Sequence, residues 1–159
     1  MVNYKSKHAI VKRPQYSLYM AMTDMRNLLG MLPEDKRQDI SADFDTLTAS
    51  VRGITIGVKV WERVPYSKIS VIDNGAPFAF KAEFHFDEVP GSPLQTEFSI
   101  TLDADLNQMM KLMVGSKIQK GLDAVVQGLA DISEGRMPEG FDPSKMPEGF
   151  DPESLKNMF

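Results

Sequence analysis

The sequence predicts an α+β fold in which a curved antiparallel sheet of about six strands wraps around one long C-terminal helix. Two observations predict it. Between residues 40 and 102, apolar and polar residues alternate with a period of two, which is typical of half-buried strands. After residue 105, apolar residues recur at the helical spacing of three and four for about 28 residues. Because a sheet with one apolar face must be covered, we expect this helix to lie across it.

The N-terminal segment predicts a strand that runs directly into a helix. Tyr4 to Arg13 mixes β-forming residues with lysines, and Pro14 suits the first turn of a helix because it lacks the donor that a strand needs. From Gln15 the apolar residues follow the helical period until Pro33. The capping pair Thr23-Asp24 indicates a bend, so two short helices are expected after the first strand.

Short turn sequences separate the central strands, so these strands are expected to be antiparallel neighbours. Asp73-Asn74-Gly75 and Pro90-Gly91-Ser92-Pro93 mark two of the turns. The predicted strands are residues 42–51, 54–60, 68–72, 78–87 and 94–103.

The long helix is predicted to begin with a capping box formed by Asp105 and Gln108. Gly115, Gly121 and Gly128 lie inside the helical pattern. Each glycine lowers the stability of the helix by about 1 kcal/mol relative to alanine. Glycine at these positions therefore indicates a close backbone approach or room left for another molecule.

Composition predicts one domain over residues 1–134 and a Pro/Gly-rich tail over 135–159. The formal net charge of −4 offers no excess positive potential for nucleic acid or an anionic membrane surface. Cysteine is absent and only two histidines occur, so neither a metal site nor a cofactor is expected. No apolar run is long enough to span a bilayer and the first residues do not resemble a signal peptide, so we expect a cytoplasmic protein.

Two stretches carry a family resemblance: residues 14–28, followed by Met31-Leu32-Pro33, and the strand of residues 57–65. Together they resemble the START-like superfamily, also called SRPBCC or the polyketide cyclase and birch-pollen-allergen group. In that group a proline starts the first helix, a Thr-Asp pair ends it and a short second helix follows. The resemblance covers about residues 4–133 and implies a helix-grip fold with a deep apolar tunnel. Its members commonly take lipids, sterols, polyketides or aromatic hormones; some are enzymes and others activate chaperones.

The leading hypothesis for function is therefore non-catalytic binding or transport of a hydrophobic small molecule, such as a lipid, a polyketide or an aromatic compound. The abundant aromatic residues and the adaptable methionines of the predicted sheet and helix would form a soft lining. The alternative is that they simply pack as core. The predicted lining residues are Val58, Val60, Phe80, Phe84, Phe86, Phe98, Ile100, Met109, Met110 and Met113.

An enzymatic alternative, of the cyclase or dehydratase type, depends on Glu62. This residue shares the strand parity of Val58 and Val60, so an undistorted strand would point its carboxylate toward the cavity as a general acid or base. A position at the mouth, or displacement by a bulge, is the competing interpretation. His85 lies among the polar positions of its strand, so a catalytic role would require the cavity to be on the opposite face of the sheet. Asp43 and Asp45 could form a paired-carboxylate site only in a facing geometry, and solvated edge charge explains them better.

A third function class is protein interaction, including association with a chaperone. Trp61 is predicted on the outer face of the sheet, where a large aromatic residue often marks a contact surface such as a homodimer interface. In the tail, Met137–Pro143 recurs residue for residue as Met146–Pro152. This repeat is either a mobile acidic extension or a bivalent motif that presents Phe141 and Phe150 to a partner or to a groove.

Overall fold

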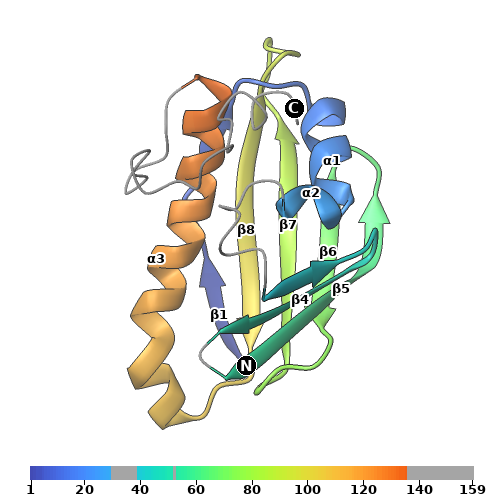
Figure 1. The fold of residues 1–159 in the computed structure, drawn as a ribbon. Helices are drawn as coiled ribbons and strands as arrows, with labels where there is room; N and C mark the ends of the chain where they lie inside the picture. The colour runs from blue at the N-terminus through green and yellow to red at the C-terminus, as the bar shows by residue number, and fades with distance from the viewer. Residues whose placement is uncertain (30–38, 52, 136–159) are drawn as a thin grey trace.

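The computed structural model describes residues 1–29, 39–51 and 53–135, which form an antiparallel sheet with helices on one face (Figure 1). The elements in chain order are β1 (Val2–Lys5), β2 (Ala9–Val11), α1 (Gln15–Thr23), α2 (Arg26–Leu29), β3 (Ile40–Ala42), β4 (Thr46–Val51), β5 (Ile54–Val64), β6 (Lys68–Asp73), β7 (Phe80–Glu88), β8 (Thr96–Ala104) and α3 (Gln108–Ser133). This arrangement confirms the predicted α+β helix-grip class. The repeat residues of the tail, Phe141 and Phe150 among them, lie outside the described residues.

The sheet has eight strands in the order β1-β8-β7-β6-β5-β4-β3, and β2 also pairs with β8. The count exceeds the expected six because two predicted strands are each divided. The first is interrupted at Ser6, whose hydroxyl accepts a hydrogen bond from the Ile100 amide (2.8 Å) while its own amide donates to the Ile100 carbonyl (2.9 Å). The second is interrupted at Asp43, whose carboxylate accepts from the amides of Asp45 (3.0 Å) and Thr46 (2.8 Å) and so holds a tight turn between β3 and β4. Side-chain bonds of this kind compete locally with the strand ladder.

The bend between α1 and α2 lies where Thr23-Asp24 predicted it. Asp24 has extended backbone angles (φ −97°, ψ 111°), and its carboxylate accepts from the Arg26 amide at 3.0 Å and from the Arg26 guanidinium at 2.7 Å. The hydrogen bonds from Arg26 lower the pKa of Asp24. The carboxylate therefore stays ionised and caps α2.

The start of α3 differs from the prediction by two residues. Asn107, rather than Asp105, is the N-cap, and its side-chain oxygen accepts from the Met110 amide at 2.8 Å. At the other end, Gly135 adopts a left-handed conformation (φ 81°) that terminates the helix, and its amide donates to the Ile132 carbonyl at 3.0 Å. Within the part of the chain that the structure describes, no helix is both long and apolar enough to cross a membrane.

The core lies on the sheet face that carries the helices. α1 packs on β6 and β7, whereas α3 packs on β1, β2 and β8 along one side of the sheet (Figure 1). Phe86 and Phe98 are fully buried at the centre with Ile69, and α1 and α3 contribute Leu18 and Leu129. Because α3 follows one side of the sheet rather than its middle, the two helices leave part of the apolar face between them.

Candidate functional site

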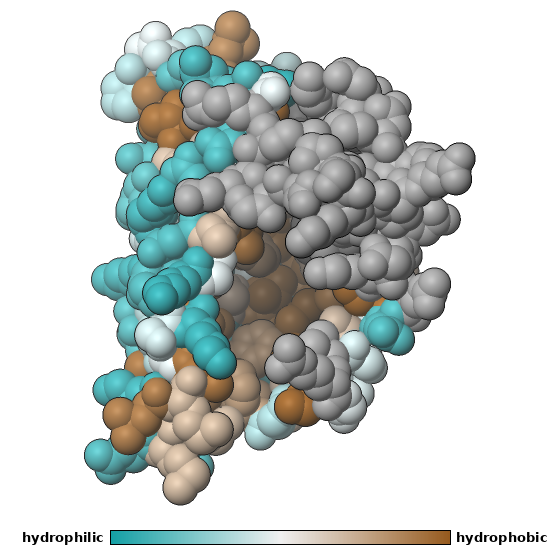
Figure 2. All heavy atoms as spheres, turned by 60° about the vertical axis from the view of Figure 1, so that its left-hand side comes forward, coloured by the Kyte–Doolittle hydropathy of each residue, from teal (hydrophilic) through white to brown (hydrophobic). Residues whose placement is uncertain are grey.

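A hollow with an apolar floor opens beside α3 (Figure 2). On the sheet, Val60, Phe84 and Leu102 are only half-buried although they lie against the core cluster. They belong to the helix-covered face, because Phe84 pairs with Ile69 and Val60 pairs with Val71, both of which are core residues. Apolar surface is thus available on the inner face of the sheet.

The helix contributes a matching apolar stripe. Val114, Ile118, Gly121 and Val125 follow one another at helical spacing, and we call them the open flank of α3. Val125 is 49% exposed, and a methyl group built on Gly121 would meet nothing within 4 Å.

Hydrogen bonds on the opposite side of α3 fix the direction of the open flank. The Gln119 amide group donates to the Lys5 carbonyl at 2.7 Å, the Lys7 amide donates to the Asp123 carboxylate at 2.7 Å, and the Lys7 ammonium donates to Gln127. These bonds tie that side of the helix to the connection between β1 and β2, at the edge of the sheet. The open flank is therefore directed away from that edge and across the inner face of the sheet, about a quarter turn from the buried side of the helix that carries Val126 and Leu129.

The glycines of α3 have different surroundings. At Gly115 an added methyl group would lie 3.0 Å from the Tyr4 hydroxyl, so this glycine permits the close approach of β1 to the helix. Gly121 instead borders open space. The close neighbour of Gly115 is a side chain rather than the backbone that the sequence led us to expect.

The residues predicted to line a cavity fall into three groups. Phe80, Phe86, Phe98 and Ile100 are packed into the core, which is the alternative that the sequence left open. Met109 and Met113 are 70% and 66% exposed on the first turns of α3, on a side of the helix that neither the core nor the open flank includes. The half-buried members are Val58, Val60, Phe84 and Met110.

Glu62 does not point into the hollow. A β-bulge falls between Val60 and Glu62, so that Val60 pairs with Val71 but Glu62 pairs with Ser70. The bulge shifts the alternation by one residue and turns the Glu62 carboxylate to the outer face. There it lies 3.0 Å from the Lys68 ammonium, which also contacts Glu83 at 3.2 Å. These two carboxylates raise the pKa of Lys68.

The outer face is polar, with one large aromatic residue. Trp61 is 51% exposed there, as the sequence predicted, and the Lys81 ammonium lies 5.7 Å from the centre of its ring. His85 is hydrogen-bonded to the Thr101 hydroxyl at 3.1 Å. A shallow depression of about 440 Å³ runs between Trp61 and the charged residues.

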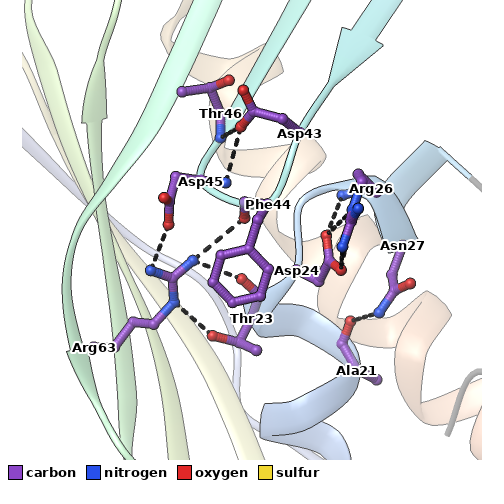
Figure 3. A network of polar contacts seen from close by, with 10 residues as sticks. All are labelled: Ala21, Thr23, Asp24, Arg26, Asn27, Asp43, Phe44, Asp45, Thr46 and Arg63. Atoms are coloured by element: carbon purple, nitrogen blue, oxygen red, sulfur yellow. Dashed lines mark hydrogen bonds and ion pairs between the residues drawn. The ribbon is translucent and has the colours of Figure 1, made fainter.

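Arg63 organises a network that sequence reasoning missed (Figure 3). The same bulge brings its side chain to the inner side, where the guanidinium donates to the Thr23 hydroxyl (2.7 Å), the Thr23 carbonyl (2.9 Å) and the Asp45 carboxylate (2.7 Å). It also lies 4.5 Å from the centre of the Phe44 ring. The network fastens the end of α1 to the turn between β3 and β4, so Asp43 and Asp45 have structural roles. No local sequence signal could have shown the network, because Arg63 lies 40 positions from Thr23 and 18 positions from Asp45.

Comparison with known proteins shows a similar fold and little similarity in sequence. No protein-family model matches the chain, and no curated protein matches its sequence. A protein of Thermobifida fusca has a TM-score of 0.66 at 13% identity, with 89% of this chain and 100% of that chain covered. A protein of Thermus thermophilus has a TM-score of 0.56 at 11% identity, with 84% and 98% covered. The Aha1 dimer from Colwellia psychrerythraea has a TM-score of 0.55 at 15% identity, with 82% and 97% covered. At these identities the likeness shows the fold alone, and it agrees with the helix-grip architecture.

Proposed function

We propose that the protein binds a hydrophobic small molecule in the hollow between α3 and the inner face of the sheet, without chemical conversion. The observation that carries this proposal is the open flank of α3, which leaves Val125 exposed and Gly121 bordered by empty space. Apolar surface gains roughly 25 cal/mol for each Å² removed from water, so an apolar ligand that covers this flank and the half-buried residues of the sheet is stabilised.

The position of the ionisable side chains supports binding over catalysis. Glu62, the candidate acid or base of the enzymatic alternative, is paired with Lys68 on the outer face. His85 is hydrogen-bonded to Thr101 on the same face. A general acid or base must lie within hydrogen-bond reach of its substrate, and neither group can reach one in the hollow.

Filling the hollow from the helix side tests this proposal. Gly121→Leu is expected to weaken binding of the dye 1-N-phenylnaphthylamine at least about tenfold, because the added side chain occupies the ligand's space. The same substitution is expected to raise the melting temperature, because leucine is favoured over glycine in a helix by somewhat less than the roughly 0.8–1 kcal/mol that separates alanine from glycine. A fluorescence titration and a thermal melt measure the two effects.

Lys120→Leu is the matched control, since it adds an apolar side chain to an exposed position one residue away. It should leave dye binding unchanged. Equal affinities of the Gly121→Leu, Lys120→Leu and unmodified proteins would refute binding in the hollow. Organic extraction of the unmodified protein, followed by mass spectrometry, would identify the class of any co-purifying ligand.

Self-association through the outer face is a second candidate function. The observation that favours it is Trp61, a half-exposed tryptophan among lysines and glutamates that can pair with a second copy of the same surface. The similar structure from Colwellia psychrerythraea is described as a dimer. Trp61→Ala is expected to weaken association at least about tenfold in sedimentation equilibrium, since exposed tryptophans often dominate interface energies. A monomeric mass for the unmodified protein at high concentration would exclude this candidate.

A further inference from the structure

A groove on the outer side of α1 is independent of the hollow. It has a volume of about 540 Å³ and is lined by Pro14, Gln15, Tyr16, Met20, Tyr66 and Pro93; we call it the aromatic groove. A second depression of about 510 Å³, which shares Gln15 and Tyr66 with it, continues along Pro65 and Ser67 to Asp87 and Glu88. Tyr16 and Met20 are exposed on the opposite side of α1 from its core residues, and Tyr66, in the turn between β5 and β6, is half-exposed. None of the six lining residues is charged, so the groove suits aromatic and proline side chains.

One wall of the aromatic groove is held in a strained conformation. The segment Val64-Pro65-Tyr66-Ser67 forms a turn closed by a bond from the Ser67 amide to the Val64 carbonyl at 2.9 Å. Tyr66 occupies the turn position that requires a positive φ and has φ 67°, although glycine or asparagine is normal there. Its ring packs edge-on against Tyr19, with 5.6 Å between ring centres. This packing holds the Tyr66 ring in place as one wall of the aromatic groove.

The groove lies beside the point from which the tail departs. Near the end of α3, the Ser133 hydroxyl accepts from the Lys12 amide at 2.9 Å, and the Ser133 carbonyl accepts from the Arg13 guanidinium at 3.1 Å. Pro14, the next residue along the chain, already lines the groove. Phe141 follows Gly135 by six residues, and an extended chain covers about 20 Å in that number, so the first copy of the repeat can reach the groove.

We infer that the aromatic groove is the docking site for the chain's own Met-Pro-Glu-Gly-Phe-Asp-Pro repeat, one copy of which binds within the same molecule. Each copy has two prolines and one phenylalanine. Proline-containing segments dock in grooves lined by aromatic rings, because the restricted proline backbone loses little entropy on binding. Attachment through a short tether gives the repeat an effective concentration in the millimolar range, so weak contacts suffice. The second copy competes for the same groove.

A spin label on the tail tests this inference in the full chain. Because the sequence contains no cysteine, Lys145→Cys places a nitroxide at one position, between the two copies of the repeat. We expect the label to reduce the amide signals of Gln15, Tyr16 and Tyr66 to below about half of their intensity with the label reduced. The amides of Val114 and Ile118 on the open flank should keep their intensity.

Removal of the groove aromatics separates docking from mere tethering. In a Tyr16→Ala, Tyr66→Gly background, the losses at Gln15 should disappear while the fold is kept, since glycine relieves the strain at position 66. Phe141→Ala with Phe150→Ala should have the same effect. Losses that persist in these variants, or that occur at Val114 and Ile118 instead, would overturn the inference. So would losses in a mixture of isotope-labelled protein and separate spin-labelled protein, which would show binding to a second molecule.

Discussion

Replacing Gly57 by alanine is expected to lower the free energy of unfolding by more than about 3 kcal/mol. A methyl group at this position would lie 2.0 Å from the Asn74 carbonyl oxygen and 3.0 Å from its carbon, and both atoms belong to the backbone. The turn cannot move away freely, because the Asn74 amide donates to the Gly57 carbonyl and the Gly57 amide donates to the Gly75 carbonyl, both at 2.7 Å. Urea unfolding followed by circular dichroism measures the change.

Gly121→Ala is the matched control, because it makes the same chemical change where nothing lies within 4 Å. It should stabilise the protein by up to about 1 kcal/mol, the difference in helix propensity. If Gly57→Ala instead unfolds within about 1 kcal/mol of the unmodified protein, the close contact between β5 and the turn after β6 is incorrect.

Replacing Phe98 by alanine is expected to cost about 3–5 kcal/mol, the range for a large aromatic residue removed from a packed core. Phe98 is fully buried, and the centre of its ring lies 5.4 Å from that of Phe86 and 6.4 Å from that of Phe84. Leu94→Ala, at a 71% exposed position just before the same strand, should change stability by less than about 0.5 kcal/mol. Comparison of the two unfolding curves shows whether Phe98 is packed in the core or lines a cavity. A decrease in the free energy of unfolding below about 1 kcal/mol for Phe98→Ala would mean that its ring faces a void rather than packed neighbours.

The regular parts of the fold could be predicted from the sequence because they depend on local periodicity. Alternation over β5, β7 and β8 and the long stripe of α3 identified the sheet and its helix. The divided strands could not be predicted, because Ser6 and Asp43 replace ladder bonds by side-chain bonds that depend on tertiary position. The bulge at Glu62 has no periodic signal, yet it exchanges the faces of Glu62 and Arg63 and so decides which of them is near α1.

The sequence could place apolar residues of the sheet on its inner face, but it could not place those of the helix. Val58, Val60 and Phe84 could be placed from strand parity alone. Met109 and Met113 could not, because the rotation of α3 is set by distant contacts, such as those of Gln119 with Lys5. Nothing in the sequence around Pro65 gave a reason to expect Tyr66 at a positive φ.

Binding in the hollow, the central claim, is tested most directly by intermolecular nuclear Overhauser effects between bound 1-N-phenylnaphthylamine and the protein's methyl groups. We expect contacts from the dye to the methyl groups of Val125 on the open flank of α3 and of Val58 on β5. Leu94 and Leu112, which are 71% and 80% exposed elsewhere, should show none. Contacts confined to such exposed positions, or to Met20 in the aromatic groove, would contradict the proposal that the hollow is the binding site.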